Sequence, residues 1–168
     1  MDSEVTIERA TADDVDAVAR LWVRLARDQR AYDSYVLAEE NRATMRETLA
    51  AYRLEDGLLV ARADGSIAGF ASFSVERGAL ELDGTRATLS NLYVEPSYRD
   101  RGIGATLLEA VEESLAGRGI DVLTLEVMAD NDAARRFYRR RGYETFRVAM
   151  HRDLENRSEN DTHSKEGR

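Results

Sequence analysis

The chain has 168 residues, of which 32 are Asp or Glu and 24 are Lys or Arg, so its formal net charge is −8. This length suits one domain with an ordinary core, and the negative charge argues against nucleic acid as a partner, because its phosphates would be repelled. The chain contains no cysteine, which excludes disulfides and a covalent cysteinyl intermediate.

The N-terminal third predicts a strand followed by two helices. Residues 5–9 alternate between apolar and polar side chains, as a half-buried strand does. Thr11 is expected to cap the first helix, in which apolar residues recur at helical spacing. Trp22 belongs to that apolar stripe, so we expect it to pack in the core and not against a ligand. One face of the second helix carries Met45, Leu49 and Tyr52.

The middle of the chain predicts a hairpin and a third long strand. Residues 57–63 and 66–76 flank Asp64-Gly65, a dipeptide that is typical of two-residue hairpin turns. Residues 78–84 form a looser connection, which leads into a strand over residues 86–95.

The most informative segment is LYVEPSYRDRGIGATLL, residues 92–108. It predicts a strand that ends at a proline, a short basic loop with two glycines, and a helix. The glycines let the backbone approach a ligand without interference from Cβ, and the first amides of the helix lack intrahelical partners at the positive end of the helix dipole. These features predict an anion site that suits a diphosphate. Its residues are Arg99, Arg101, Gly102, Ile103, Gly104 and Ala105.

Three kinds of phosphate-binding loop fit this segment to different degrees. A Walker loop requires Lys-Ser/Thr where Ala105 and Thr106 stand. A dinucleotide-binding loop requires a small residue where Leu107 stands, although Glu126 lies at a suitable distance for a ribose contact. The third kind fits at every position: Arg-x-x-Gly-x-Gly after a strand ending in Val-x-Pro resembles the pyrophosphate loop of the GCN5-related N-acetyltransferases (GNATs), which bind acetyl-CoA.

A second block, residues 123–143, is similar to the next strand and helix of the same family. It contains the pattern Asn-x-x-Ala-x-x-x-Tyr-x-x-x-Gly-Phe/Tyr in full, from Asn131 through Tyr138 to Tyr143. The two blocks occur in the family's order, about 30 residues apart. Together they carry the resemblance.

The resemblance implies an α/β (α+β) fold in a single GNAT-type domain over residues 1–154. The family has a mixed sheet of six or seven strands and about four helices. The elements expected after the loop are a helix from Gly102 to about Ala116, a strand at 121–128, a helix at 131–140 and a last strand from Tyr143 to about Arg152. Residues 155–168 are polar and charged, and we expect a disordered tail there.

In the family the strands that correspond to residues 86–95 and 121–128 splay apart, and acetyl-CoA enters the gap. By resemblance, the backbone of Leu92, Tyr93 and Val94 pairs with the pantetheine arm as if the arm were another strand. Asn131 resembles a residue that contacts the pantetheine or, alternatively, caps the following helix. Among the arginines of that helix, Arg139 is the candidate contact for the 3′-phosphate of CoA.

The resemblance also implies the catalytic residues. With no cysteine available, the amine attacks the bound thioester directly. Tyr138 occupies the position whose hydroxyl, in the family, protonates the leaving thiolate; alternatively, it packs the helix on the sheet together with Phe137. Glu126 resembles the glutamate proposed to deprotonate the amine through water in enzymes that acetylate the N-terminus of a ribosomal protein. Alternatively, Glu126 orders water or caps an amide.

The expected acceptor is a primary amine, either a small molecule or a protein N-terminus or lysine. Residues 29–41 and 78–86 would flank it. A non-catalytic acyl-CoA-binding sensor or assembly module is the alternative function, and a homodimer is common in the family. We expect no metal site, because the two histidines, His151 and His163, are isolated.

Of the 24 basic residues, only Lys165 is a lysine. Either a GC-rich genome or a halophilic source, whose proteins keep acidic and lysine-poor surfaces, explains this bias. The acidic N-terminus lacks the features of a signal peptide, and no apolar stretch reaches the length of a membrane span. We therefore expect a cytoplasmic protein without a membrane partner.

Overall fold

The computed structural model describes residues 4–155, which divide into two compact units. The first unit ends at Asn131 and the second begins at Asp132. The described part of the first unit contains one sheet with strand order β1-β2-β3-β4-β5, in which only the β4–β5 pair is parallel. The strands are β1 (Thr6–Arg9), β2 (Leu58–Ala63), β3 (Ser66–Val75), β4 (Arg86–Val94) and β5 (Val122–Leu125).

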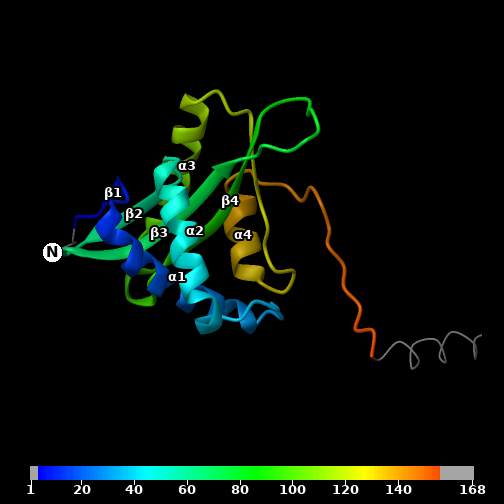
Figure 1. The fold of residues 1–168 in the computed structure, drawn as a ribbon, viewed down its shortest axis with the longest axis horizontal. Coiled ribbons are helices and arrows are strands. Elements are labelled where there is room, and N and C mark those ends of the chain that lie inside the picture. The colour runs from blue at the N-terminus through cyan, green and yellow to red at the C-terminus, as the bar shows by residue number, and fades with distance from the viewer. Residues whose placement is uncertain (1–3, 156–168) are drawn as a thin grey trace, which may run out of the picture. The chain divides into compact units, whose positions relative to one another are not determined.

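Helices cover both faces of this sheet (Figure 1). Helices α1 (Val15–Arg30) and α2 (Arg42–Leu54) pack on one face, where Trp22, Leu49 and Phe70 belong to one buried cluster. Trp22 is 7% exposed, so its predicted place in the core is confirmed. Helix α3 (Ile103–Gly117) packs on the opposite face. Side chains of a strand alternate between the two faces, so Phe73, three residues after Phe70, lies on the α3 side. The guanidinium of Arg118, directly after α3, lies over the Phe73 ring.

The hairpin and the first helix follow the prediction closely. Asp64 and Gly65 both have positive φ, 54° and 76°, which is the conformation that a two-residue type I′ turn requires. Thr11 does cap a helical segment, but a 3₁₀ turn over Ala12–Asp14 precedes α1. The Thr11 amide and hydroxyl donate hydrogen bonds of 2.8 and 3.1 Å to the Asp14 carboxylate. A second 3₁₀ turn, Glu39–Asn41, precedes α2.

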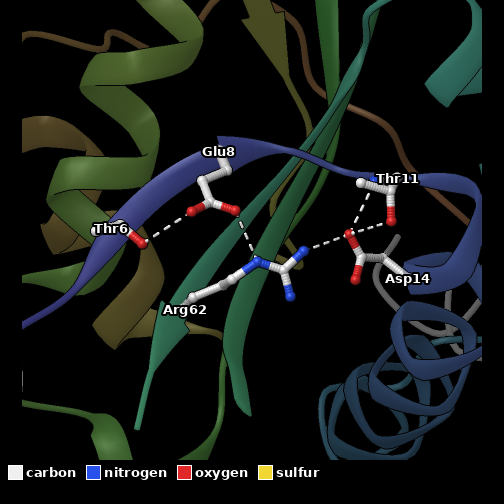
Figure 2. A network of polar contacts seen from close by, with 5 residues as sticks. All are labelled: Thr6, Glu8, Thr11, Asp14 and Arg62. Atoms are coloured by element: carbon white, nitrogen blue, oxygen red, sulfur yellow. Dashed lines mark hydrogen bonds and ion pairs between the residues drawn. The ribbon is translucent and has the colours of Figure 1, made fainter. Parts of the chain in front are cut away.

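A polar network joins β1, β2 and the start of α1 (Figure 2). The Arg62 Nε donates to the Glu8 carboxylate at 2.7 Å, and the Arg62 Nη2 donates to Asp14 at 2.5 Å. Burial alone would raise the pKa of Asp14, but hydrogen bonds from the Thr11 amide and the Arg62 guanidinium outweigh it, so the pKa is lowered. The ionised carboxylate therefore stabilises the fold.

The prediction of six or seven strands is wrong for the described residues, where the sheet has five. Strand β5 is shorter than predicted, and the segment from Tyr143 to Arg152 forms no strand. Its apolar residues alternate, but Phe146 and Met150 are 66% and 93% exposed. Alternation shows only that a segment could pair, whereas a strand forms only where a neighbouring backbone satisfies its N–H and C=O groups.

The second unit contains helix α4 (Asp132–Arg140). Its end is a Schellman motif, in which the amides of Tyr143 and Gly142 donate to the carbonyls of Tyr138 and Arg139 at 3.1 Å each. Apart from Glu155, the tail predicted at residues 155–168 lies outside the described residues. Within residues 4–155, no helix is long and apolar enough to cross a membrane.

We predict that Asp14→Asn lowers the free energy of unfolding by about 1–2 kcal/mol at pH 7, because the three charge-assisted hydrogen bonds to this carboxylate are weakened. Since the folded-state pKa is lowered, this stabilisation is present above the unfolded-state value of about 3.9 and is lost as the pH falls through the folded-state value. Urea unfolding at pH 7 and pH 3 measures the difference. Asp13→Asn, at the exposed neighbour, is the control, and a pH-independent Asp14→Asn effect would contradict the assignment.

Candidate functional site

The loop before α3 has the geometry of an anion cradle. Asp100 and Gly102 both have positive φ, 63° and 77°, so successive amides of the loop turn toward one side. Gly102 is the N-cap of α3, and the first intrahelical bond runs from the Thr106 amide to the Gly102 carbonyl at 3.0 Å. The amides of residues 103–105 therefore have no intrahelical acceptor and lie at the positive end of the helix. The loop and the start of the helix therefore have the backbone geometry that the sequence predicted, whereas binding of a diphosphate there stays a prediction.

A free strand edge leads directly into this cradle. The last residue pair between β4 and β5 is Leu89↔Leu125, so Ser90 and Glu126 are the first residues past the fork of the two strands. Beyond the fork, β3 is the only strand that pairs with β4 among residues 4–155. The Glu95 amide donates to the β3 carbonyl of Ala68 at 2.8 Å. Because alternate strand residues point their backbone groups to opposite neighbours, Leu92 and Val94 present theirs away from β3.

Polar side chains gather at the fork, and the sequence analysis did not assign them to the site. The Tyr52 hydroxyl lies 2.8 Å from the Ser90 hydroxyl, and the Asn91 amide donates to the Ser72 hydroxyl at 2.7 Å. Ser72 is fully buried. The available signal was Ser72 itself, a polar residue in the apolar run of the strand predicted over residues 66–76.

A carboxylate also lies near the fork. The Thr88 hydroxyl donates to Glu76 at 2.9 Å and lies 3.2 Å from the hydroxyl of Thr124, its partner on β5. Glu126 is exposed and follows directly after β5. The first unit therefore holds the Glu76 carboxylate beside the last β4–β5 pairs, and the chain reaches Glu126 directly after them.

The two arginines of the loop lie in different surroundings. The Arg99 Nε donates to the Val94 carbonyl at 2.9 Å, and its Nη2 lies 3.6 Å from Asp28 of α1. The Arg101 guanidinium lies over the Tyr98 ring, 5.6 Å from its centroid. Both are exposed at the rim of the cradle.

The remaining predicted residues lie at or beyond the start of α4. Asn131 directly precedes α4, and its amide donates to the Met128 carbonyl at 3.0 Å. Tyr138 lies on α4, with its ring edge-on to Phe137 and Tyr143 at centroid distances of 5.1 and 5.7 Å. Burial raises the pKa of Tyr138 to about 12, so the phenol is protonated at neutral pH. Arg139 is exposed.

Residues 4–155 contain no group of three or more His, Cys, Asp or Glu side chains that could hold a metal ion.

Comparison with known proteins assigns the class to which this fold belongs. Residues 16–143 match the acetyltransferase (GNAT) family, and the chain belongs to that family. It is 36% identical over 148 residues to a mycothiol acetyltransferase of Clavibacter sepedonicus, a match that covers 85% of this chain and 44% of that protein. It also matches an uncharacterized N-acetyltransferase of Methanocaldococcus jannaschii at 29% identity over 139 residues, which are 83% of this chain and 60% of that protein. The chain therefore spans only part of the length of these two relatives.

Solved structures share the fold at lower identity. A GCN5-related N-acetyltransferase from Ralstonia eutropha JMP134 superposes with a TM-score of 0.72 at 22% identity, over 90% of this chain and 99% of that one. An aminoglycoside N-acetyltransferase in complex with CoA superposes with a TM-score of 0.67 at 19% identity, over 92% and 97%. These likenesses confirm the predicted mixed α/β architecture.

We predict that Gly102→Ala destabilises the protein by about 1 kcal/mol, because an L side chain disfavours the left-handed conformation at this residue. A Cβ there would meet nothing within 4 Å, so the cost comes from the backbone alone. Gly117→Ala is the matched control. It also has open space but no positive φ, and it should stabilise α3 by about 0.5 kcal/mol. Chemical denaturation measures both, and effects of the same sign would contradict this account.

Proposed function

We propose that this chain transfers an acetyl group from acetyl-CoA to a primary amine. One observation carries the proposal: the free edge of β4 runs directly into the amides at the start of α3. A ligand with an amide-bearing arm next to a diphosphate suits both features at once. Family membership and the CoA complex of a structural neighbour support the same donor.

The predicted cofactor-binding residues fit this donor. The amides of Ile103, Gly104 and Ala105 would hold the diphosphate, with Arg101 adding positive charge. The outward backbone groups of Leu92 and the outward amide of Val94 would pair with the pantetheine arm, on either side of Tyr93, while the Val94 carbonyl accepts from Arg99. Arg99, Gly102, Asn131 and Arg139 stay predicted members of the same set.

In the proposed reaction, a neutral amine attacks the thioester carbon, and the bond from that carbon to sulfur breaks. The amine nitrogen loses a proton and the sulfur gains one. Glu126 would accept, through water, the proton that the ammonium form of the acceptor must lose before the attack, because Glu126 is the first residue past the last β4–β5 pair. Tyr138 would donate the proton to the leaving thiolate, and its raised pKa keeps that proton in place.

The acceptor class is also a proposal. Relatives carry the names mycothiol acetyltransferase and aminoglycoside N-acetyltransferase, which favour a small amine over a peptide. The exposed segments at residues 29–41 and 78–86, predicted to flank the acceptor, carry several carboxylates that suit a cation.

The test is CoA release from acetyl-CoA in molar KCl against pooled aminoglycosides, amino acids, polyamines and peptides, followed by mass spectrometry. We expect one pool to gain an acetyl group. Binding of acetyl-CoA without any product would favour a non-catalytic sensor instead. Failure of acetyl-CoA to raise the melting temperature would overturn the donor assignment.

We predict that Tyr138→Phe lowers kcat about 10²-fold and leaves the Kd for acetyl-CoA unchanged, because only the proton donor is removed. The ring contacts with Phe137 and Tyr143 persist in this variant. Tyr143→Phe, which removes a hydroxyl from the same ring contact, is the control and should keep wild-type kcat. Steady-state kinetics and calorimetry make the comparison, and equal kcat values for the two variants would refute the donor role.

We predict that Glu126→Gln lowers kcat/KM about 10²-fold at pH 7. The loss should shrink as the pH approaches the pKa of a free alkyl amine, about 10, because the ammonium form of the acceptor then loses its proton to solvent. The pH profile of kcat/KM for wild type and variant decides this. A loss by the same factor at every pH would assign Glu126 to substrate positioning.

A further inference from the structure

Two ion pairs join the C-terminal half of α1 to the end of β4 and the following loop. Arg24 pairs with Glu95, and Asp28 pairs with Arg99. Arg24 and Asp28 lie one helical turn apart and therefore on the same side of α1. The two pairs have opposite polarity, so a shift of α1 by one turn would bring like charges together. This arrangement sets the register of α1 against the loop.

The guanidinium of Arg99 is engaged on three sides. Its Nε donates to the Val94 carbonyl at 2.9 Å, its Nη2 lies 3.6 Å from the Asp28 carboxylate, and its Cζ lies 5.6 Å from the centroid of the Tyr93 ring. Arg99 thereby ties the last residue of β4 to α1. Arg101 differs, since among residues 4–155 no carboxylate lies within ion-pair distance of its guanidinium.

We propose that Asp28 and Arg99 are positioning residues for the anion site, and that Arg101 is the arginine that supplies charge to the ligand. This inference rests on the proposed function, since it concerns the binding of CoA. Arg99 would act by holding the Val94 carbonyl, and with it the loop that leads to Gly102. We call the Asp28–Arg99–Val94 arrangement the clasp.

Stability alone does not account for the clasp. The Asp28 and Arg99 side chains are 57% and 46% exposed, and ion pairs as exposed as this contribute little to folding. Moreover, the Asp28 carboxylate places a negative charge near a site for an anion, where Coulomb repulsion opposes binding. The carboxylate favours binding only if its effect on Arg99 and the loop outweighs that repulsion.

This opposition of effects gives a test with a definite sign. If Asp28 acts only through its charge, Asp28→Asn should bind CoA more tightly. If it positions Arg99, the variant should bind CoA more weakly, by about threefold to tenfold. Calorimetry with CoA as the probe measures the Kd. Asp16→Asn is the matched control. It removes another carboxylate of α1, one that is paired with Arg46 of α2, and should leave the Kd unchanged.

Substitutions of the arginines separate the two roles further. Arg99→Lys keeps the charge but has no Nε–H to donate to Val94, so it should bind CoA as weakly as Arg99→Met. Arg101→Lys should retain most of the affinity that Arg101→Met loses. The salt dependence of the Kd should flatten for Arg101→Met and stay unchanged for Arg99→Met, because only Arg101→Met removes a positive charge that interacts with the ligand. Recovery of binding in Arg99→Lys would overturn the proposal.

A readout without ligand separates this inference from the proposed function. In the free protein, amide hydrogen exchange over residues 99–106 should be faster in Asp28→Asn than in wild type or Asp16→Asn, because the clasp is weakened. If wild type fails to bind CoA, the donor assignment fails while the exchange rates still decide the clasp. Equal exchange rates, or tighter CoA binding by Asp28→Asn, would refute it.

Discussion

The candidate site depends on one mismatch within the sheet: β4 continues past the residue where its pairing with β5 ends. Unpaired strand groups need partners, and a strand edge inside a protein is costly unless water or a ligand supplies them. Here the edge that has no second strand partner among residues 4–155 runs from Ser90 to Val94, shortly before the turn that leads to α3, and only its last carbonyl is taken, by Arg99. The edge and the anion cradle are therefore consecutive in the chain, and one extended ligand can use both.

A β-bulge explains where the pairing stops. Ser72 pairs with Asn91 while Phe73 pairs with Leu89, so Ser90 is the extra residue on β4. A bulge bends its strand and increases the local twist, and Ser90 follows directly after the last residue that pairs with β5. The buried hydroxyl of Ser72 accepts a hydrogen bond from Asn91, which satisfies a polar group that would otherwise destabilise the core. The polar residues at the fork thus support its geometry.

The parts of the fold that were predictable from sequence are those with local causes. The turn at Asp64-Gly65 needs positive φ at both residues, and the loop before α3 needs positive φ at its N-cap, Gly102. These residue types favour positive φ, so the sequence predicts both features. The short β5, the bulge at Ser90 and the failure of residues 143–152 to form a strand depend on which distant strand lies alongside, which no local pattern encodes. The same holds for Arg99: its charge was visible in the sequence, whereas its partner Asp28 lies on a helix far away in the chain.

For Tyr138, the sequence left proton donation and packing as alternatives; the structure shows ring contacts within the second unit, and these contacts are compatible with the proposed proton donation. Its ring lies edge-on to Tyr143, the contact that accompanies the Schellman motif at the end of α4. The contact holds the ring in place, while burial raises the pKa of the hydroxyl and keeps its proton bound. Packing and chemistry act on different atoms of the side chain. A packing role for the ring is therefore no argument against a catalytic role for the hydroxyl, because the packing is what would orient the donor.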